Sequence, residues 1–529
     1  MIEGDRKVVE DDFSETTFPF LFSSQPPGID NLWIGAGIFL VVVMVSILLA
    51  RASVVNALTQ ISPVYAIVAV AIAVAFIQFI SLSGIRINES SLAFNVISQT
   101  PLGLLKPLND EASTPILFLL LLKGISQSLS DVDAGLRLVP LLCHIVSVIL
   151  LARISQLATT DHVIQCAATA TFCFAPTVIY YSPEVGSFTS DTLAVMLLYF
   201  LYLQSRPWTV PARFAILAIA GVLCLAFSTL SFLILIALGI VLIAESRREK
   251  KHLVYAILTI LAWVSTCTAL NHLFHYPLYS DGVVARFNPF QLPFWNNLHT
   301  AAEALYEPVF GRSWDVAAIF YIAGGAFLAV NRRYRTITLL IIPSLLYIGF
   351  FGTLAFPTKP QHPLFQLPLL LTMTLFGIYY FCEWTKTPFR QFFLFLPVVL
   401  SLANLPKISP LKNGEVEETI AQLNSTIRPG QIVYVDSAAE DAFRYYSATG
   451  RVTFDNEVRY GPPTLPDDLM TQQPPIWILF DSRTDEAIEN VRKSIDLLRN
   501  HGRIIDSYYS SKGISLYLFE GNWFRTHGY

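Results

Sequence analysis

Long apolar runs separated by short polar segments fill the chain from Leu32 to Asn404. Most of the runs are about 18 to 22 residues long, which is the length that an α-helix needs to cross roughly 30 Å of hydrocarbon. The pattern therefore predicts an α-helical polytopic membrane protein with about twelve spans. The predicted spans cover residues 32–50, 64–83, 136–154, 163–180, 187–204, 212–228, 230–245, 253–272, 314–331, 336–356, 364–383 and 389–404.

One apolar run differs from the others. It extends from Pro115 to Ser128 and contains Lys123. A run of about fourteen residues is short for a span, and a crossing here would invert every later loop. We therefore expect this segment to lie along the membrane interface or to re-enter the bilayer.

Basic residues set the expected orientation in the membrane. The clusters at 247–251 and 332–335 fall on the same side as Arg206 when the spans alternate. Short loops rich in lysine and arginine face the cytoplasm. We therefore expect these clusters on the cytoplasmic side of a plasma (inner) membrane. The outer face then receives the acidic N-terminal tail 1–31, the segments around Glu89 and Glu184, the loops 273–313 and 357–363, and everything after Leu405.

The long apolar runs end near residue 404, and a more polar sequence follows. Short β-branched and aromatic runs at 431–436, 476–481, 503–506 and 514–519 predict strands, and the apolar period within 484–500 predicts an amphipathic helix. This alternation indicates an extracytoplasmic α/β domain over 405–529, following a transmembrane domain over 32–404. Because no glycine-rich phosphate loop follows a strand, nucleotide binding there is unsupported.

Composition excludes several classes of function. Hydrophobic residues make up 53% of the 529 residues and charged residues 14%, with a net charge of -4. Without a basic patch, nucleic acid is not an expected partner. All six cysteines lie in or at the ends of apolar runs, so we expect small buried side chains rather than disulfides or a metal site. The sequence implies no cofactor, and nothing in it supports a divalent metal.

Carboxylates beside membrane spans are the first candidates for catalysis. A charge near the bilayer is energetically unfavourable, so such residues usually have a function. Glu89 follows a span and is the best candidate base, although it also suits a helix end in water. Asp110 and Glu111 precede the short apolar run and could instead cap a helix. Glu184 follows Pro183 and could be a turn residue.

Cations on the outer face are candidates for binding an anionic group. Lys359 and His362 lie in a proline-rich turn between two predicted spans. Lysine serves as a point charge, although a basic residue in a wet loop is common. Arg137, at the start of a span, could reach an anion or extend to the interface.

Several outer-face segments together resemble the GT-C superfamily of membrane glycosyltransferases, most closely the branch of protein O-mannosyltransferases and bacterial aminoarabinose transferases. They are Asn88-Glu89-Ser90-Ser91-Leu92-Ala93, Ser113-Thr114-Pro115-Ile116-Leu117, Gly135-Leu136-Arg137-Leu138, Tyr181-Ser182-Pro183-Glu184 and Lys359-Pro360-Gln361-His362-Pro363-Leu364-Phe365. The likeness covers most of the chain in layout, and each motif is short. The family usually begins its first outer loop with an Asp-Glu pair, and here Asn88 stands at the Asp position.

The resemblance implies transfer of a sugar from a polyprenyl-phosphate donor to a lipid, glycan or protein acceptor, with inversion. It implies catalytic roles for Glu89, Glu184, Asp110 or Glu111, and contacts of Lys359, His362 and Arg137 with the donor phosphate. Two alternatives stay open. About twelve spans also suit a transporter or flippase, although no repeated halves are evident. Asn88 also allows a non-catalytic scaffold derived from the enzyme fold.

Overall fold

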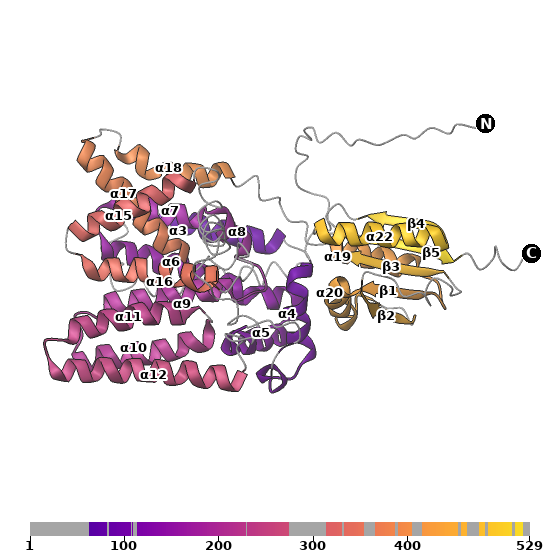
Figure 1. Ribbon diagram of the computed structural model, residues 1–529, viewed down its shortest axis with the longest axis horizontal. Helices are drawn as coiled ribbons and strands as arrows, with labels where there is room; N and C mark the ends of the chain where they lie inside the picture. Colours follow the sequence, from indigo (N-terminus) through magenta and orange to yellow (C-terminus); the bar gives the residue numbers. More distant parts are fainter. Residues whose placement is uncertain are drawn as a thin grey trace, which may run out of the picture. The chain divides into compact units, whose positions relative to one another are not determined.

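The computed structural model describes residues 63–81, 84–106, 108, 114–228, 230–274, 314–330, 333–353, 366–386, 390–404, 415–452, 456–462, 475–481, 485–509 and 514–521 (Figure 1). Several sequence predictions fall outside these residues. They are the acidic tail 1–31, the span 32–50, most of the loop 273–313, and the candidate site residues Asp110, Glu111, Lys359 and His362.

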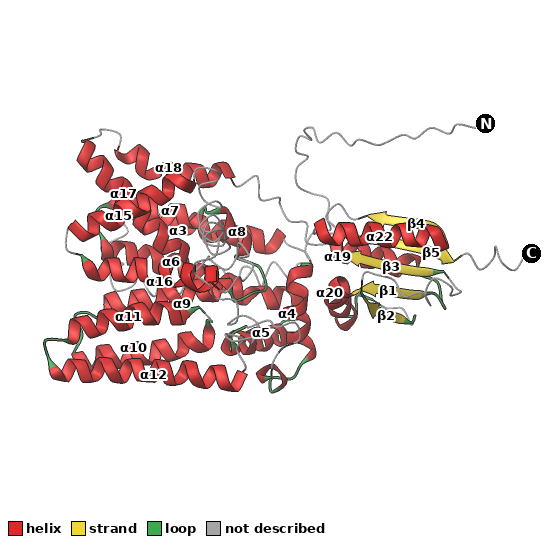
Figure 2. Ribbon diagram, in the orientation of Figure 1, coloured by secondary structure: helices red, strands yellow, loops and turns green. Residues whose placement is uncertain are grey.

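Helices make up all of the described region before residue 405 apart from short connections (Figure 2). Apart from α4 and α5, each begins or ends within a few residues of a predicted span, and their apolar composition matches the sequence pattern. The first ten are α3 (Pro63–Ser81), α4 (Ile87–Ser98), α5 (Ile116–Ser128), α6 (Val132–Ala158), α7 (His162–Cys173), α8 (Pro176–Tyr181), α9 (Phe188–Gln204), α10 (Val210–Phe227), α11 (Ser231–Ser246) and α12 (Lys250–Phe274). They are followed by α15 (Trp314–Val330), α16 (Tyr334–Thr353), α17 (Leu367–Thr385) and α18 (Arg390–Asn404).

The surface of these helices is that of a membrane protein. In the described part, five helices (α3, α6, α10, α12 and α17) are long and apolar enough to cross a bilayer, and six apolar segments are shorter. Large apolar side chains point outward, including Ile77 on α3 at 63% exposure and Ile322 on α15 at 69%. Such residues are unfavourable in water and are expected to face lipid. The prediction of an α-helical membrane domain is therefore confirmed.

Two local predictions need correction. The segment beginning at Asn88 was expected to be a loop, but residues 87–98 form helix α4. The predicted span 163–180 is divided into α7 and α8, because Phe174 ends the first helix and Pro176 begins the second. Proline lacks the N–H that a continuous helix requires and fits the first turn of a new one.

The C-terminal region is an α/β domain with one mixed sheet. Its strands are β1 (Ile432–Asp436), β2 (Val458–Gly461), β3 (Ile476–Asp481), β4 (Gly502–Tyr509) and β5 (Ile514–Gly521), in the order β2-β1-β3-β5-β4. The pairs of β1 with β2 and β3 are parallel, and the pairs of β5 with β3 and β4 are antiparallel. The helices are α19 (Glu415–Thr426), α20 (Ser437–Ala448) and α22 (Asp485–His501).

Four strands and α22 agree with the sequence prediction, whereas β2, α19 and α20 were not predicted. Helix α20 has a special role, because it packs on α4 of the helical domain. Its side chains Phe443, Tyr445 and Tyr446 share one apolar cluster with Leu92 and Ala93 of α4. The N-terminal end of α4, where Glu89 lies, is thereby held between the two domains.

Candidate functional site

Four charged side chains meet in the interior beside the start of α4. They are Arg86, Glu89, Arg137 and Glu184, and none is more than 7% exposed. Arg86 Nε lies 3.5 Å from Glu89 Oε1, and Arg86 Nη1 lies 2.8 Å from Glu184 Oε2. Arg137 Nη2 lies 3.7 Å from Glu89 Oε2. We call these four residues the Glu89 cluster.

A tight turn before α4 places the first two members. Gly84 has a φ of 65°, a left-handed conformation that glycine adopts without steric cost. Arg86 is extended and is the N-cap residue of α4, and the Glu89 N–H donates to its carbonyl at 3.0 Å. Glu89 therefore occupies the first turn of the helix, where the unpaired N–H groups favour a negative charge.

Helix α6 supplies the second arginine. Its N-cap is Asp131, whose side chain accepts from the Ala134 N–H at 3.2 Å, and Arg137 follows in the second turn. The Arg137 guanidinium also donates to the carbonyl of Gly84. One buried side chain thus connects α6 both to the turn before α4 and to Glu89.

Glu184 comes from the connection between α8 and α9. Burial raises the pKa of the Glu184 carboxyl, the nearby Glu89 carboxylate raises it further, and Arg86 and Arg137 oppose the shift. Arg86 also stacks over the ring of Tyr180, 4.2 Å from its centroid. Arg86 is thus the cation that contacts both carboxylates of the cluster.

Glu89 is unusual among these groups because its hydrogen-bonding capacity is unused. Within the part of the chain that the structure describes, neither of its oxygens accepts a hydrogen bond, although the side chain is only 1% exposed. Its two ion pairs are longer than ordinary charge-assisted hydrogen bonds. A buried carboxylate of this kind can accept a hydrogen bond from an incoming donor.

A second set of charges joins α6 to the C-terminal domain. Tyr445 donates to Asp133 Oδ1, and Arg451 Nη2 lies 3.0 Å from Asp133 Oδ2. Arg451 Nη1 also lies 3.1 Å from Glu417 Oε1. Burial raises the pKa of Glu417, and the Arg451 charge opposes that shift. We call Asp133, Glu417, Tyr445 and Arg451 the Asp133 cluster.

Tyr446 connects α20 directly to the turn that carries Arg86. Its hydroxyl accepts from the N–H of Ile85 and donates to the carbonyl of Ile85, both at 3.0 Å. The tyrosine is fully buried. The C-terminal domain thus fixes the backbone one residue before Arg86.

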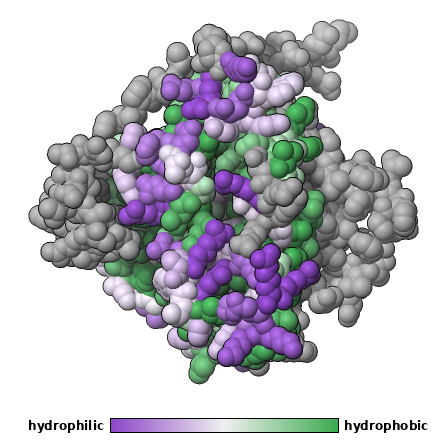
Figure 3. All heavy atoms as spheres, turned by 90° about the vertical axis from the view of Figure 1, so that its left-hand side faces the viewer, coloured by the Kyte–Doolittle hydropathy of each residue, from purple (hydrophilic) through white to green (hydrophobic). Residues whose placement is uncertain are grey.

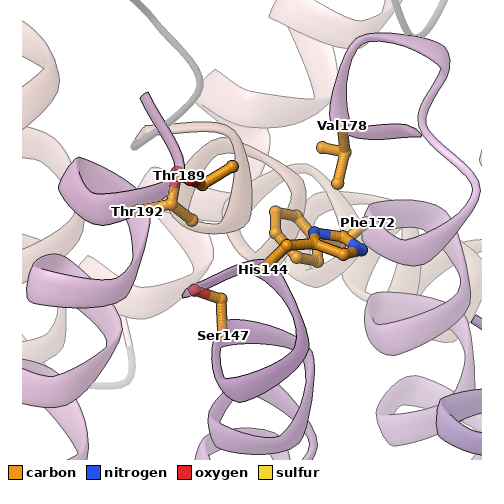
Figure 4. Close-up of a pocket in the computed structure, with 6 residues that line it drawn as sticks. All are labelled: His144, Ser147, Phe172, Val178, Thr189 and Thr192. Atoms are coloured by element: carbon orange, nitrogen blue, oxygen red, sulfur yellow. The ribbon is translucent and has the colours of Figure 1, made fainter. Parts of the chain in front are cut away.

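A small polar cavity lies deeper in the helical domain. It has a volume of about 10 Å³ and is lined by His144, Ser147, Phe172, Val178, Thr189 and Thr192, from α6 to α9 (Figure 4). The His144 and Phe172 rings lie close together on one side, with the hydroxyl-bearing residues on the other. The space suits about one water molecule and is too small for a sugar.

The structure brings three predicted site residues together, namely Glu89, Glu184 and Arg137. Arg86 was not singled out from the sequence, although an arginine three residues before a candidate carboxylate was a usable signal. Asp191 is separate from the cluster, and it accepts a hydrogen bond from the Ser228 hydroxyl at 2.5 Å.

The cysteines lie among apolar side chains. All six are free, and five are buried. In the residues that are described, no group of three or more histidine, cysteine, aspartate or glutamate side chains has the geometry to hold a metal ion.

Comparisons with known proteins give a likeness of fold at low sequence identity. No protein-family model matches the sequence, and no curated protein matches it significantly. The chain is similar to the crystal structure of ArnT from Cupriavidus metallidurans bound to undecaprenyl phosphate, with 11% identity, a TM-score of 0.48, and coverage of 86% of this chain and 97% of that chain. It is also similar to the apo state of the same protein, with 12% identity, a TM-score of 0.47 and the same coverage.

Proposed function

We propose that this chain is a GT-C-type membrane glycosyltransferase that transfers a sugar from a polyprenyl-phosphate donor to an acceptor hydroxyl on the outer face of the membrane. The observation that carries the proposal is Glu89, a buried carboxylate whose oxygens accept no hydrogen bond among the described residues. It lies between two arginines at the start of a helix, in the segment whose sequence resembles the first outer loop of that superfamily.

The chemistry assigns each charge a task. The acceptor hydroxyl attacks the anomeric carbon, the bond from that carbon to the phosphate oxygen breaks, and polyprenyl phosphate leaves with the electron pair. Glu89 takes the proton of the hydroxyl, and a single displacement inverts the anomeric configuration. Arg86 and Arg137 supply positive charge beside the reacting groups, and Lys359 and His362 are proposed to hold the donor phosphate.

Burial of the Glu89 cluster also suits a purely structural ion network, because two arginines and two glutamates can neutralise one another. The two roles differ in what the Glu89 charge does. A structural carboxylate contributes to folding alone, whereas a base contributes to turnover. Stability and transfer therefore have to be measured on the same variant.

The test is Glu89→Gln, which keeps the size of the side chain and removes its charge. We expect turnover to fall by about two to four orders of magnitude, the usual contribution of a positioned base, while binding of undecaprenyl phosphate is retained. Asp191→Asn is the matched control, because it neutralises another buried carboxylate of the helical domain that lies outside the cluster. A fully active Glu89→Gln protein would contradict the proposed role.

A second experiment adds a negative charge at position 88 instead of removing one at position 89. If the ancestral base stood at position 88, then Asn88→Asp raises transfer and Glu89→Gln has little effect. If Glu89 is the base, Asn88→Asp adds a competing charge and brings no gain. Release of undecaprenyl phosphate from a panel of its sugar conjugates measures both variants on the same scale.

A further inference from the structure

A cavity of about 200 Å³ lies at the other end of α6 and α9 from the Glu89 cluster. Along α6, the distance from Arg137 to the cavity residue Ile154 is about 25 Å at the usual helical rise. That is close to the thickness of the hydrocarbon layer, so the cavity lies near the opposite membrane face. Its walls come from the C-terminal ends of α6, α9 and α15 and from the first half of α16 and α17.

The cavity combines an apolar wall with two cations. Leu157, Leu203 and Phe376 belong to the wall, and Arg206 and Arg333 are the charged residues that line it. Both arginines are exposed, and in the ion pairs of the described residues neither has a carboxylate partner. Arg206 stacks on Tyr202 at 5.0 Å and donates to its hydroxyl at 3.4 Å, which keeps the guanidinium near the cavity.

The charged residues that line the cavity lie at a polar end of the helical domain. Arg206 lies in the turn between α9 and α10, and Figure 3 views the end where α10 and α12 begin, with hydrophilic residues gathered among hydrophobic helix surfaces. Leu157, at 48% exposure, connects the apolar wall to the outside. The cavity therefore presents positive charge at the interface and apolar surface toward the bilayer.

We propose that this cavity binds an anionic phospholipid of the bilayer, with its phosphate between Arg206 and Arg333 and one acyl chain along the apolar wall. Basic pockets between transmembrane helices recognise lipid headgroups by this combination of charge and hydrocarbon contact. The lipid joins α6 and α9 to α15, α16 and α17, so its binding stabilises the folded chain by mass action. This assignment is independent of the proposed transfer reaction.

The experiment uses the full-length protein purified in detergent and titrated with dioleoyl phosphatidylglycerol. Native mass spectrometry counts bound lipid, and the thermal unfolding midpoint measures stabilisation. Dioleoyl phosphatidylcholine tests the need for net negative charge, and glycerol 3-phosphate tests the headgroup without chains. Undecaprenyl phosphate tests whether the cavity takes a carrier lipid instead.

The charge variant is the double substitution Arg206→Gln with Arg333→Gln. With two cations removed, we expect the affinity for phosphatidylglycerol to fall about 30-fold. The matched control is Arg247→Gln with Arg248→Gln, which removes two exposed arginines from the turn between α11 and α12 that do not line the cavity. The control is expected to bind phosphatidylglycerol like the unmodified protein.

A third variant tests the apolar part and keeps both arginines. Ala158 is exposed and lines the cavity, so Ala158→Trp fills the space without disturbing the core. We expect it to weaken phosphatidylglycerol binding and to leave the unfolding midpoint of the lipid-free protein unchanged.

Four results would overturn the assignment. One is equal stabilisation by phosphatidylcholine and phosphatidylglycerol, and another is equal affinity in the charge variant and its control. Binding of glycerol 3-phosphate as tight as that of the lipid would show a simple anion site. Preferential binding of undecaprenyl phosphate would show a carrier-lipid site.

Discussion

The Glu89 cluster and the Asp133 cluster meet on α6, which supplies Arg137 to the first and Asp133 to the second. The carboxylates of the two clusters differ in how closely their partners lie. Asp133 Oδ1 accepts a hydrogen bond from Tyr445, and Asp133 Oδ2 lies 3.0 Å from Arg451 Nη2 in an ion pair. The oxygens of Glu89 face arginines at 3.5 and 3.7 Å, and neither accepts a hydrogen bond among the described residues. The carboxylate with one hydrogen bond and a short ion pair serves as an anchor, whereas the one with two long ion pairs can accept a hydrogen bond from a substrate.

The largest expected difference between the clusters is the effect of removing an arginine. Arg86→Met leaves two buried carboxylates with Arg137 alone, and we expect a loss of about 3–5 kcal/mol of folding stability. Arg451→Met, at a position that is one-third exposed, is the matched control, with a loss of about 1 kcal/mol or less. Thermal unfolding in detergent measures both. Equal losses would remove the distinction between the two clusters.

Removing the anchor charge should affect stability more than chemistry. Asp133→Asn weakens the contacts with Tyr445 and Arg451, and we expect a loss of about 1–3 kcal/mol. The folded fraction should keep most of its transfer activity, because Asp133 has no role in proton transfer. Activity normalised to folded protein is the measurement. A loss as large as that of Glu89→Gln would place Asp133 in the reaction.

The raised pKa of Glu184 predicts that the stability of the folded chain depends on pH. Between the ordinary glutamate pKa and the raised folded value, the folded chain keeps a proton that the unfolded chain has released. Stability therefore falls as the pH rises through this interval, by up to about 1.4 kcal/mol per pH unit. Glu184→Gln should reduce that slope, and Glu417, whose pKa is also raised by burial, contributes to the slope that remains. An unchanged slope in the variant would show that Glu184 does not contribute to it.

The smallest expected effect concerns the Tyr446 hydroxyl, which connects α20 to Ile85 in the turn before α4. Tyr446→Phe removes both hydrogen bonds to Ile85, and we expect a loss of about 1–2 kcal/mol together with lower turnover, because the turn carrying Arg86 loosens. Tyr434→Phe removes a comparable hydrogen bond, to the Pro462 carbonyl at 2.8 Å, away from the cluster. Turnover should fall only in the first variant. Equal turnover in both would show that Tyr446 does not position Arg86.

Most of the helical fold could be predicted from sequence because hydrophobic length is a local property. The spans matching α6, α9 and α17 needed only their apolar runs. The break at Pro176 was readable but was outweighed by the continuous hydropathy on both sides. Helix α4 was missed because its polar sequence, Asn88-Glu89-Ser90-Ser91, is typical of a loop, and its stability comes from packing against α20.

The candidate site was predictable in part for a similar reason. Glu89, Glu184 and Arg137 were marked by charge beside apolar runs, which sequence displays directly. Their assembly with Arg86 depends on the turn at Gly84 and on contacts between residues nearly one hundred positions apart. Nothing local indicates that Tyr446 reaches Ile85 or that Tyr445 and Arg451 reach Asp133.

The separation of Tyr446 from Ile85 by 361 positions has a consequence for biosynthesis. Ribosomes deliver the helical domain to the membrane first, and domains fold broadly in the order of their synthesis. The nascent chain therefore carries Asp133 and the turn at residues 84–86 without their tyrosine partners until α20 emerges. A chain cut short before Ser437 would insert its helices and still lack the hydroxyl that holds Ile85, so the Glu89 cluster matures only when translation is almost complete.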